Sequence, residues 1–128
     1  MPHFDGPIYA PTIATISLQS HTVLNFYEPP ATDDDAEEQQ LIKPLSERLK
    51  FGLLVEPRSL LVLKRDLYEK YLHGIEEVVN DVLNDNVLRL SDDTKKLDNG
   101  HCLERKTRIS LTIRQVKKRS KMMLKLGK

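Results

Sequence analysis

The sequence has little of what stabilises small secreted or membrane-bound proteins. It contains one cysteine, Cys102, so no disulfide can form within the chain, and we expect a reducing compartment, the cytoplasm and the nucleus. No apolar run approaches the roughly 18 residues that a membrane span requires. The first residues offer neither a basic nor an apolar leader, so we expect no secretory signal.

Tryptophan is absent, and aromatic residues make up only 5% of the chain. Hydrophobic residues still account for 39% of the 128 residues, which is too many for a disordered chain. A chain of this length suffices for one globular domain and not comfortably for two.

An excess of either charge is also missing, because the net charge is +1. The charge is nevertheless segregated: residues 28–47 hold seven acids and one lysine, whereas residues 105–128 hold ten basic residues and no acid. The acidic segment has few large apolar residues, and we expect an exposed, mobile loop. The basic tail, 117–128, is typical either of phosphate binding or of an amphipathic segment packed through its methionines and leucines.

Short runs of β-branched and apolar residues predict strands separated by turns. Residues 12–18 and 22–27 predict one hairpin, and residues 49–55 and 59–64 predict a second with Pro57 at its turn. Two further strands are predicted near the end of the chain, where they could pair, at 101–104 and 106–116.

Helical signals are few. A helical turn is predicted over 66–72 with Asp66 as its cap, and apolar residues at helical spacing predict a short helix over 75–84. Residues 85–100 are expected to form a loop. Many short strands and few helices indicate a mostly β fold, either an antiparallel sandwich or a jelly roll.

The last predicted strand alternates strictly between polar and apolar residues. One face carries Arg108, Ser110, Thr112 and Arg114, and the other carries Ile109, Leu111 and Ile113. An arginine at each end of one face suits a small dicarboxylate held by charge-assisted hydrogen bonds. The alternative is the solvated basic face of a surface strand.

The start of the chain offers candidate metal ligands. In an extended His3-Phe4-Asp5 segment the imidazole and the carboxylate project from the same side. Two histidines and one carboxylate on one face form the facial triad of non-haem Fe(II) oxygenases. His73, at a sharp turn, could supply the second imidazole, with His21 and His101 as competitors. A zinc site that uses Cys102 is a further alternative, although the usual Cys-x-x-Cys spacing is absent.

In chain order these features resemble the AlkB family of Fe(II)- and 2-oxoglutarate-dependent dioxygenases, which share a His-x-Asp…His…Arg-x₅-Arg pattern. The resemblance covers nearly the whole chain. It includes His3-Phe-Asp-Gly-Pro7, Thr15-Ile-Ser-Leu18, Leu53-Leu-Val-Glu56, Ser59-Leu-Leu-Val-Leu63, Leu72-His-Gly-Ile75 and Arg108-Ile-Ser-Leu-Thr-Ile-Arg114.

The resemblance implies a double-stranded β-helix, or jelly roll, with His3, Asp5 and His73 as iron ligands. Arg108 would bind the distal carboxylate of 2-oxoglutarate. Arg114, helped by Ser110, would lie near the carboxylate at the metal end. No catalytic residue is implied beyond the metal ligands, and Tyr9 would face the substrate entrance.

The implied activity is oxidative demethylation of nucleic acid, or of an associated protein, with Fe(II), 2-oxoglutarate and O₂. Alkylated DNA or RNA would be the partner, through the basic tail, and the Arg-x₅-Arg ending favours this over a protein-directed hydroxylase. Family members carry an upstream segment with an Asn-x-Tyr pair. We therefore expect residues 1–128 to be the C-terminal part of a single domain that is incomplete at its N-terminus and leaves a sheet edge exposed. The alternative is a non-catalytic truncated isoform that acts as a binding or regulatory module.

Overall fold

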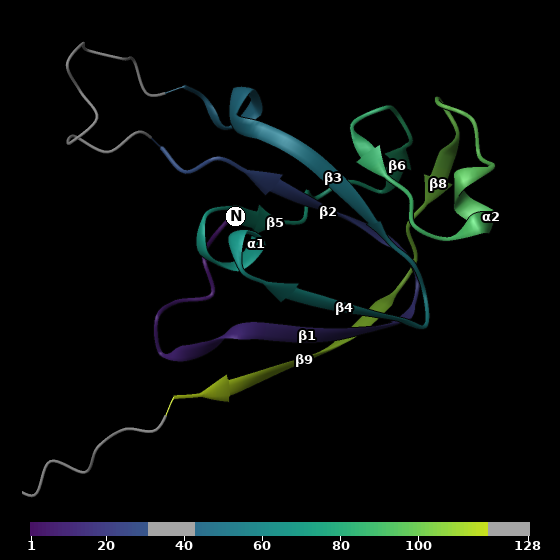
Figure 1. The fold of residues 1–128 in the computed structure, drawn as a ribbon. Helices are drawn as coiled ribbons and strands as arrows, with labels where there is room; N and C mark the ends of the chain where they lie inside the picture. The colour runs from purple at the N-terminus through teal and green to yellow at the C-terminus, as the bar shows by residue number, and fades with distance from the viewer. Residues whose placement is uncertain (31–42, 118–128) are drawn as a thin grey trace, which may run out of the picture.

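Two facing sheets make up most of the structure, a computed structural model that describes residues 1–30 and 43–117 (Figure 1). The three-stranded sheet has the order β4 (Ser59–Lys64), β1 (Tyr9–Gln19), β9 (Arg108–Val116), and all its pairs are antiparallel. The four-stranded sheet has the order β5 (Leu72–Gly74), β2 (Thr22–Tyr27), β3 (Leu49–Val55), β7 (Val87–Leu88), with the last pair parallel.

Smaller elements lie at the ends of the two sheets. A two-stranded sheet pairs β6 (Asn80–Val82) with β8 (Cys102–Glu104), and the helical segments are η2 (Leu45–Arg48), α1 (Asp66–Glu69) and α2 (Asp92–Lys95). The expected fold class is confirmed: the chain is mostly β and jelly-roll-like, and the sheets of the described residues do not close into a barrel.

Apolar side chains from both sheets form the core between them. Phe26 is completely buried and clusters with Leu53 and Val55 of its own sheet and with Leu63 of the opposite sheet. Burying each such side chain stabilises the fold by about 1.5–3 kcal/mol. This cluster holds the two sheets together beside the candidate site.

The two predicted hairpins are wrong, although their strands exist. β1 and β2 lie in different sheets, and so do β3 and β4. Both edges of β1 are occupied by β4 and β9, so β2 cannot add to it. The chain instead passes from one sheet to the other next to a residue with positive φ, Gln19 (65°) at the end of β1 and Arg58 (59°) between β3 and β4.

The predicted helix over 75–84 is also wrong. These residues contain strand β6, and the valines that would have formed the apolar face of a helix are exposed, Val79 by 75% and Val82 by 55%. The buried residue between them is Asp81, whose two carboxylate oxygens accept hydrogen bonds of 2.7 Å from Arg105 Nε and Nη2. The strand alternation that buries this carboxylate overrides the helical spacing of the apolar residues.

Three local predictions need smaller corrections. The helical turn is present as α1, but Asp66 is its first residue, and the capping position is Arg65. β8 pairs with β6 and not with β9. The expected loop 85–100 contains β7 and α2.

Two predicted segments fall largely beyond what the structure describes. Residues 31–42 of the acidic loop and 118–128 of the basic tail lie outside the described residues. The prediction that residues 1–128 are part of a single domain stays a prediction. None of the helices in residues 1–30 and 43–117 has the length and apolar character needed to cross a membrane.

Candidate active site

His3 and Asp5 lie next to His73 because the N-terminal segment pairs with β5. His3 and His73 exchange two backbone hydrogen bonds, of 3.0 and 3.1 Å. Gly74 permits this approach, because a Cβ atom there would lie 3.1 Å from the Pro2 Cα. β5 is in turn fixed by β2, where Phe26 stands opposite His73.

These three residues offer a ligand set for a metal ion. One donor atom from each of His3, Asp5 and His73 lies within 4.8 Å of the other two. His3 Nδ1 is 3.2 Å from the Met1 carbonyl oxygen, which can only accept, so in this contact Nδ1 carries the proton and Nε2 keeps its lone pair. Burial lowers the pKa of His73, although Asp5 opposes the shift, and this favours the neutral imidazole, which is the form that binds a cation.

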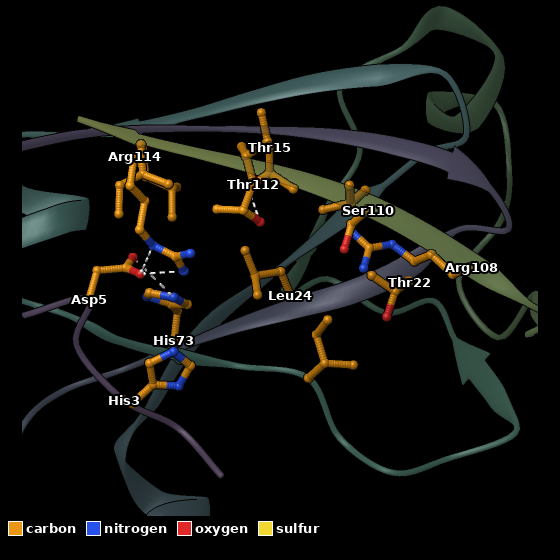
Figure 2. Close-up of a pocket in the computed structure, with 15 residues that line it drawn as sticks. His3, Asp5, Thr15, Thr22, Leu24, His73, Arg108, Ser110, Thr112 and Arg114 are labelled. Carbon is orange, nitrogen blue, oxygen red and sulfur yellow. Dashed lines mark hydrogen bonds and ion pairs between the residues drawn. The ribbon is translucent and has the colours of Figure 1, made fainter. Parts of the chain in front are cut away.

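The two oxygens of Asp5 have different neighbours. Oδ1 accepts hydrogen bonds from Arg114 Nε (3.0 Å) and Nη2 (2.8 Å), whereas Oδ2 lies 3.5 Å from His73 Nε2. The Tyr9 ring lies against the Arg114 guanidinium, with 5.5 Å between the ring centroid and Cζ. Arg114 therefore orients Asp5 through one oxygen and leaves the other facing the histidines (Figure 2).

The alternation predicted for the last strand is confirmed. The polar residues of β9 line a pocket between the sheets with a volume of about 160 Å³, while Ile109, Leu111 and Ile113 are exposed on the other face. Arg114 lies at one end of the pocket with Asp5, and Arg108 lies at the other end (Figure 2). The pocket thus has a candidate metal-ligand set at one end and the Arg108 guanidinium at the other.

Arg108 is held by the neighbouring strand. Its Nη2 donates to Ser17 Oγ at 2.8 Å, and Ser17 is fully buried and stands opposite Ser110 in the β1–β9 register. Arg108 Nε is buried and has no hydrogen-bond partner among residues 1–30 and 43–117. Burial lowers the pKa of the Arg108 guanidinium, and the positive charge of Arg105 adds to the shift. An anion bound here would offset both the loss of solvation and the repulsion from Arg105.

The other candidate residues lie elsewhere. His21 Nε2 is 3.2 Å from Asp81 Oδ2, outside the pocket, and His101 and Cys102 are exposed. Within residues 1–30 and 43–117, none of them belongs to a group of metal-ligand side chains. Tyr9 contacts Arg114 and does not line the pocket.

Sequence reasoning missed the residues that β1 and β2 contribute. Thr15 and Ser17 line or support the pocket from β1, and Thr22 and Leu24 line it from β2. The available sequence signal was the small polar residues at alternate positions of β1. One of them, Thr15, meets β9 in the structure, where its Oγ1 lies 3.4 Å from Thr112 Oγ1. Nothing in the sequence singles out Thr22.

Comparison with known proteins found a relative along the whole chain. No family model matches the chain. The chain is 44% identical over 129 aligned positions to the probable RNA/DNA demethylase ALKBH6 of Danio rerio. The resemblance to the AlkB family is confirmed. The first seven residues, the acidic segment and the last five residues look most like AlkB homologue 6, in agreement with this relative.

The AlkB relative is considerably longer than this chain. The alignment covers 100% of the chain but 52% of the relative, so the chain spans about half the length of the curated protein it matches.

Proposed function

We propose that this chain carries the Fe(II)- and 2-oxoglutarate-binding part of an AlkB-type dioxygenase that demethylates nucleic acid. The observation that carries the proposal is the pocket with His3, Asp5 and His73 at one end and Arg108 at the other. The relative's name as a probable RNA/DNA demethylase supports the reaction and the class of substrate.

The residues present fit both groups. Two imidazoles and one carboxylate on one side of a cation are the ligand set of non-haem Fe(II) enzymes. The half-buried Arg108 guanidinium, whose buried Nε has no partner among the described residues, suits a carboxylate. When bound, iron and 2-oxoglutarate would supply, with O₂, the oxidation of an N-alkyl carbon that ends in loss of the alkyl group as an aldehyde.

The chain's own residues would bind, orient and exclude water. Arg114 holds Asp5 at two hydrogen bonds to one oxygen, which fixes the carboxylate relative to His73. Arg108 would neutralise the distal carboxylate of 2-oxoglutarate from its position against Ser17. The apolar walls of the pocket would keep water out, and they comprise Ile13, Leu24, Val55, Leu61, Leu63 and Ile75.

Alkylated DNA or RNA is the proposed partner, bound in part through the basic tail. Lys117 begins this tail, and its Nζ donates to the Pro7 carbonyl at 3.2 Å, next to the segment that carries the metal ligands. A tail that starts there would begin close to the candidate site. A location in the cytoplasm and nucleus remains part of the proposal.

A second function is favoured by one observation. The chain spans about half the length of its relative, and the second function is a binding or regulatory module that binds iron and 2-oxoglutarate without turnover. The two functions differ in product formation and not in binding.

Turnover separates them. The purified chain would be incubated with Fe(II), 2-oxoglutarate, O₂ and an N-methylated single-stranded oligonucleotide, and formaldehyde and succinate would be measured. The enzyme hypothesis predicts both products, their loss in His73→Ala and their persistence in His101→Ala, since His101 is exposed outside the pocket. Binding of 2-oxoglutarate without either product would support the module and contradict the enzyme.

A further inference from the structure

Two unpaired polar groups lie at the Arg108 end of the pocket. Among the described residues, four buried side-chain nitrogen or oxygen atoms have no hydrogen-bond partner, and two of them are Thr22 Oγ1 and Arg108 Nε. Both residues line the pocket, and Thr22 is only 3% exposed. Figure 2 shows Thr22 beside Arg108, at the opposite end from His3, Asp5 and His73.

The two groups come from opposite sheets. Thr22 is the first residue of β2 and stands opposite Val55 of β3, whereas Arg108 is the first residue of β9. In the part of the chain that the structure describes, no hydrogen bond uses the Thr22 hydroxyl, which makes its burial unfavourable in the free protein. A polar group that is buried unpaired next to a cation indicates a ligand that pairs with both.

We propose that the Thr22 hydroxyl donates a hydrogen bond to the distal carboxylate of 2-oxoglutarate, beside Arg108. This inference rests on the proposed function and adds a specificity-determining residue to it. A carboxylate has two oxygens with about four acceptor positions, more than one guanidinium edge fills.

Such a hydrogen bond would help the pocket select dicarboxylates. A 2-oxo acid without the distal carboxylate, such as 2-oxovalerate, would leave the Thr22 hydroxyl and Arg108 Nε unpaired. A site built to pair with a polar group discriminates strongly against an analogue that lacks it.

The test compares Thr22→Val, which removes the hydroxyl at nearly constant shape, with Thr22→Ser, which keeps it. Dissociation constants for 2-oxoglutarate and 2-oxovalerate would be measured under anaerobic conditions from the visible band of the Fe(II) chelate. We expect Thr22→Val to weaken 2-oxoglutarate binding by about tenfold or more, as for a hydrogen bond to a charged group, and to leave 2-oxovalerate unchanged. Thr22→Ser would bind both acids nearly as the wild type does.

Thermal unfolding without ligand gives a second, independent readout. Since the hydroxyl is unpaired in the free protein, Thr22→Val would unfold at the wild-type temperature or higher. A hydroxyl with a merely structural role would give the opposite result, a lower unfolding temperature. Thr12→Val is the matched control, because Thr12 is exposed on the outer face of β1 and does not line the pocket.

The outcomes separate this inference from the function on which it rests. Equal affinity of Thr22→Val and wild type for 2-oxoglutarate would overturn the inference, and so would an equal loss for both acids. Either result leaves the proposed function standing, because the wild type still binds. A folded wild-type chain that binds neither acid would overturn the proposed function, and the inference with it.

Discussion

Arg114 is the residue whose neighbours explain most about the end of the pocket that carries the candidate metal ligands. It donates two hydrogen bonds to one oxygen of Asp5 while its guanidinium lies against the Tyr9 ring. Groups that orient a metal ligand in this way typically change metal affinity by 10–100-fold when they are removed.

We therefore predict that Arg114→Met weakens Fe(II) binding by about tenfold, because Asp5 loses the donors that fix its orientation. The measurement is an anaerobic Fe(II) titration by calorimetry. Arg58→Met is the control, since Arg58 is exposed in the turn between β3 and β4. Unchanged affinity in Arg114→Met would show that Asp5 needs no such support.

At the residue scale the sequence predicted most of the residues that lie together in the candidate site. The alternation of β9 placed Arg108 and Arg114 on one face, and the AlkB resemblance selected His73 from the histidines that spacing alone left open. The ion pair between Asp5 and Arg114 could not be predicted, because it joins residues 109 positions apart in the sequence. The Thr22 hydroxyl gave no sequence signal, because an isolated threonine at the start of a strand is ordinary.

At the scale of elements, strands were easier to predict than their partners. The runs that form β1, β2, β3 and β4 carry their own β-branched signal, which is local. Pairing depends on which strand edges are free, and β1 has both edges occupied by segments far away in sequence. A short turn between two strands therefore predicted hairpins where the chain actually crosses between sheets.

The Asp81–Arg105 pair gives a prediction at this scale. Asp81 of β6 is 6% exposed and receives both hydrogen bonds from Arg105, which follows β8. Removing one partner of a buried pair leaves the other charge unpaired, so Asp81→Asn should lower the free energy of unfolding by about 3 kcal/mol. Urea denaturation would measure the change.

Asp93→Asn serves as the control for this substitution, since the Asp93 side chain is 96% exposed and an exposed ion pair contributes little. A loss in Asp81→Asn no greater than that in Asp93→Asn would contradict the account of why residues 75–84 form a strand and not a helix.

At the scale of the whole molecule, the outer face of the three-stranded sheet is apolar and exposed. Leu60, Ile16 and Leu111 align across the three strands, and so do Val62, Ala14 and Ile113. The exposed fractions are 62% for Leu60, 53% for Leu111 and 59% for Ile113. In the described part of the chain, β9 has β1 on one edge and no strand on the other. Contiguous apolar surface and a free strand edge favour association.

We predict that the isolated chain associates with itself as its concentration rises and that Leu111→Lys shifts it toward the monomer. Sedimentation velocity over a range of concentrations would measure the change. Because Leu111 points away from the pocket, 2-oxoglutarate binding should be unaffected. A wild-type chain that stays monomeric at about 100 μM would contradict this prediction, because that concentration is well above the dissociation constants of ordinary weak interfaces.

The most direct test of the central claim is an anaerobic titration of the purified chain with Fe(II) and 2-oxoglutarate, followed by the visible charge-transfer band of the chelate. We predict that the band forms with the wild type and with His101→Ala. His73→Ala should abolish it, and Arg108→Ala should require at least about tenfold more 2-oxoglutarate, because a charge-assisted pair is lost. A folded wild-type chain without the band, or an undiminished band in His73→Ala, would contradict the assignment of this pocket.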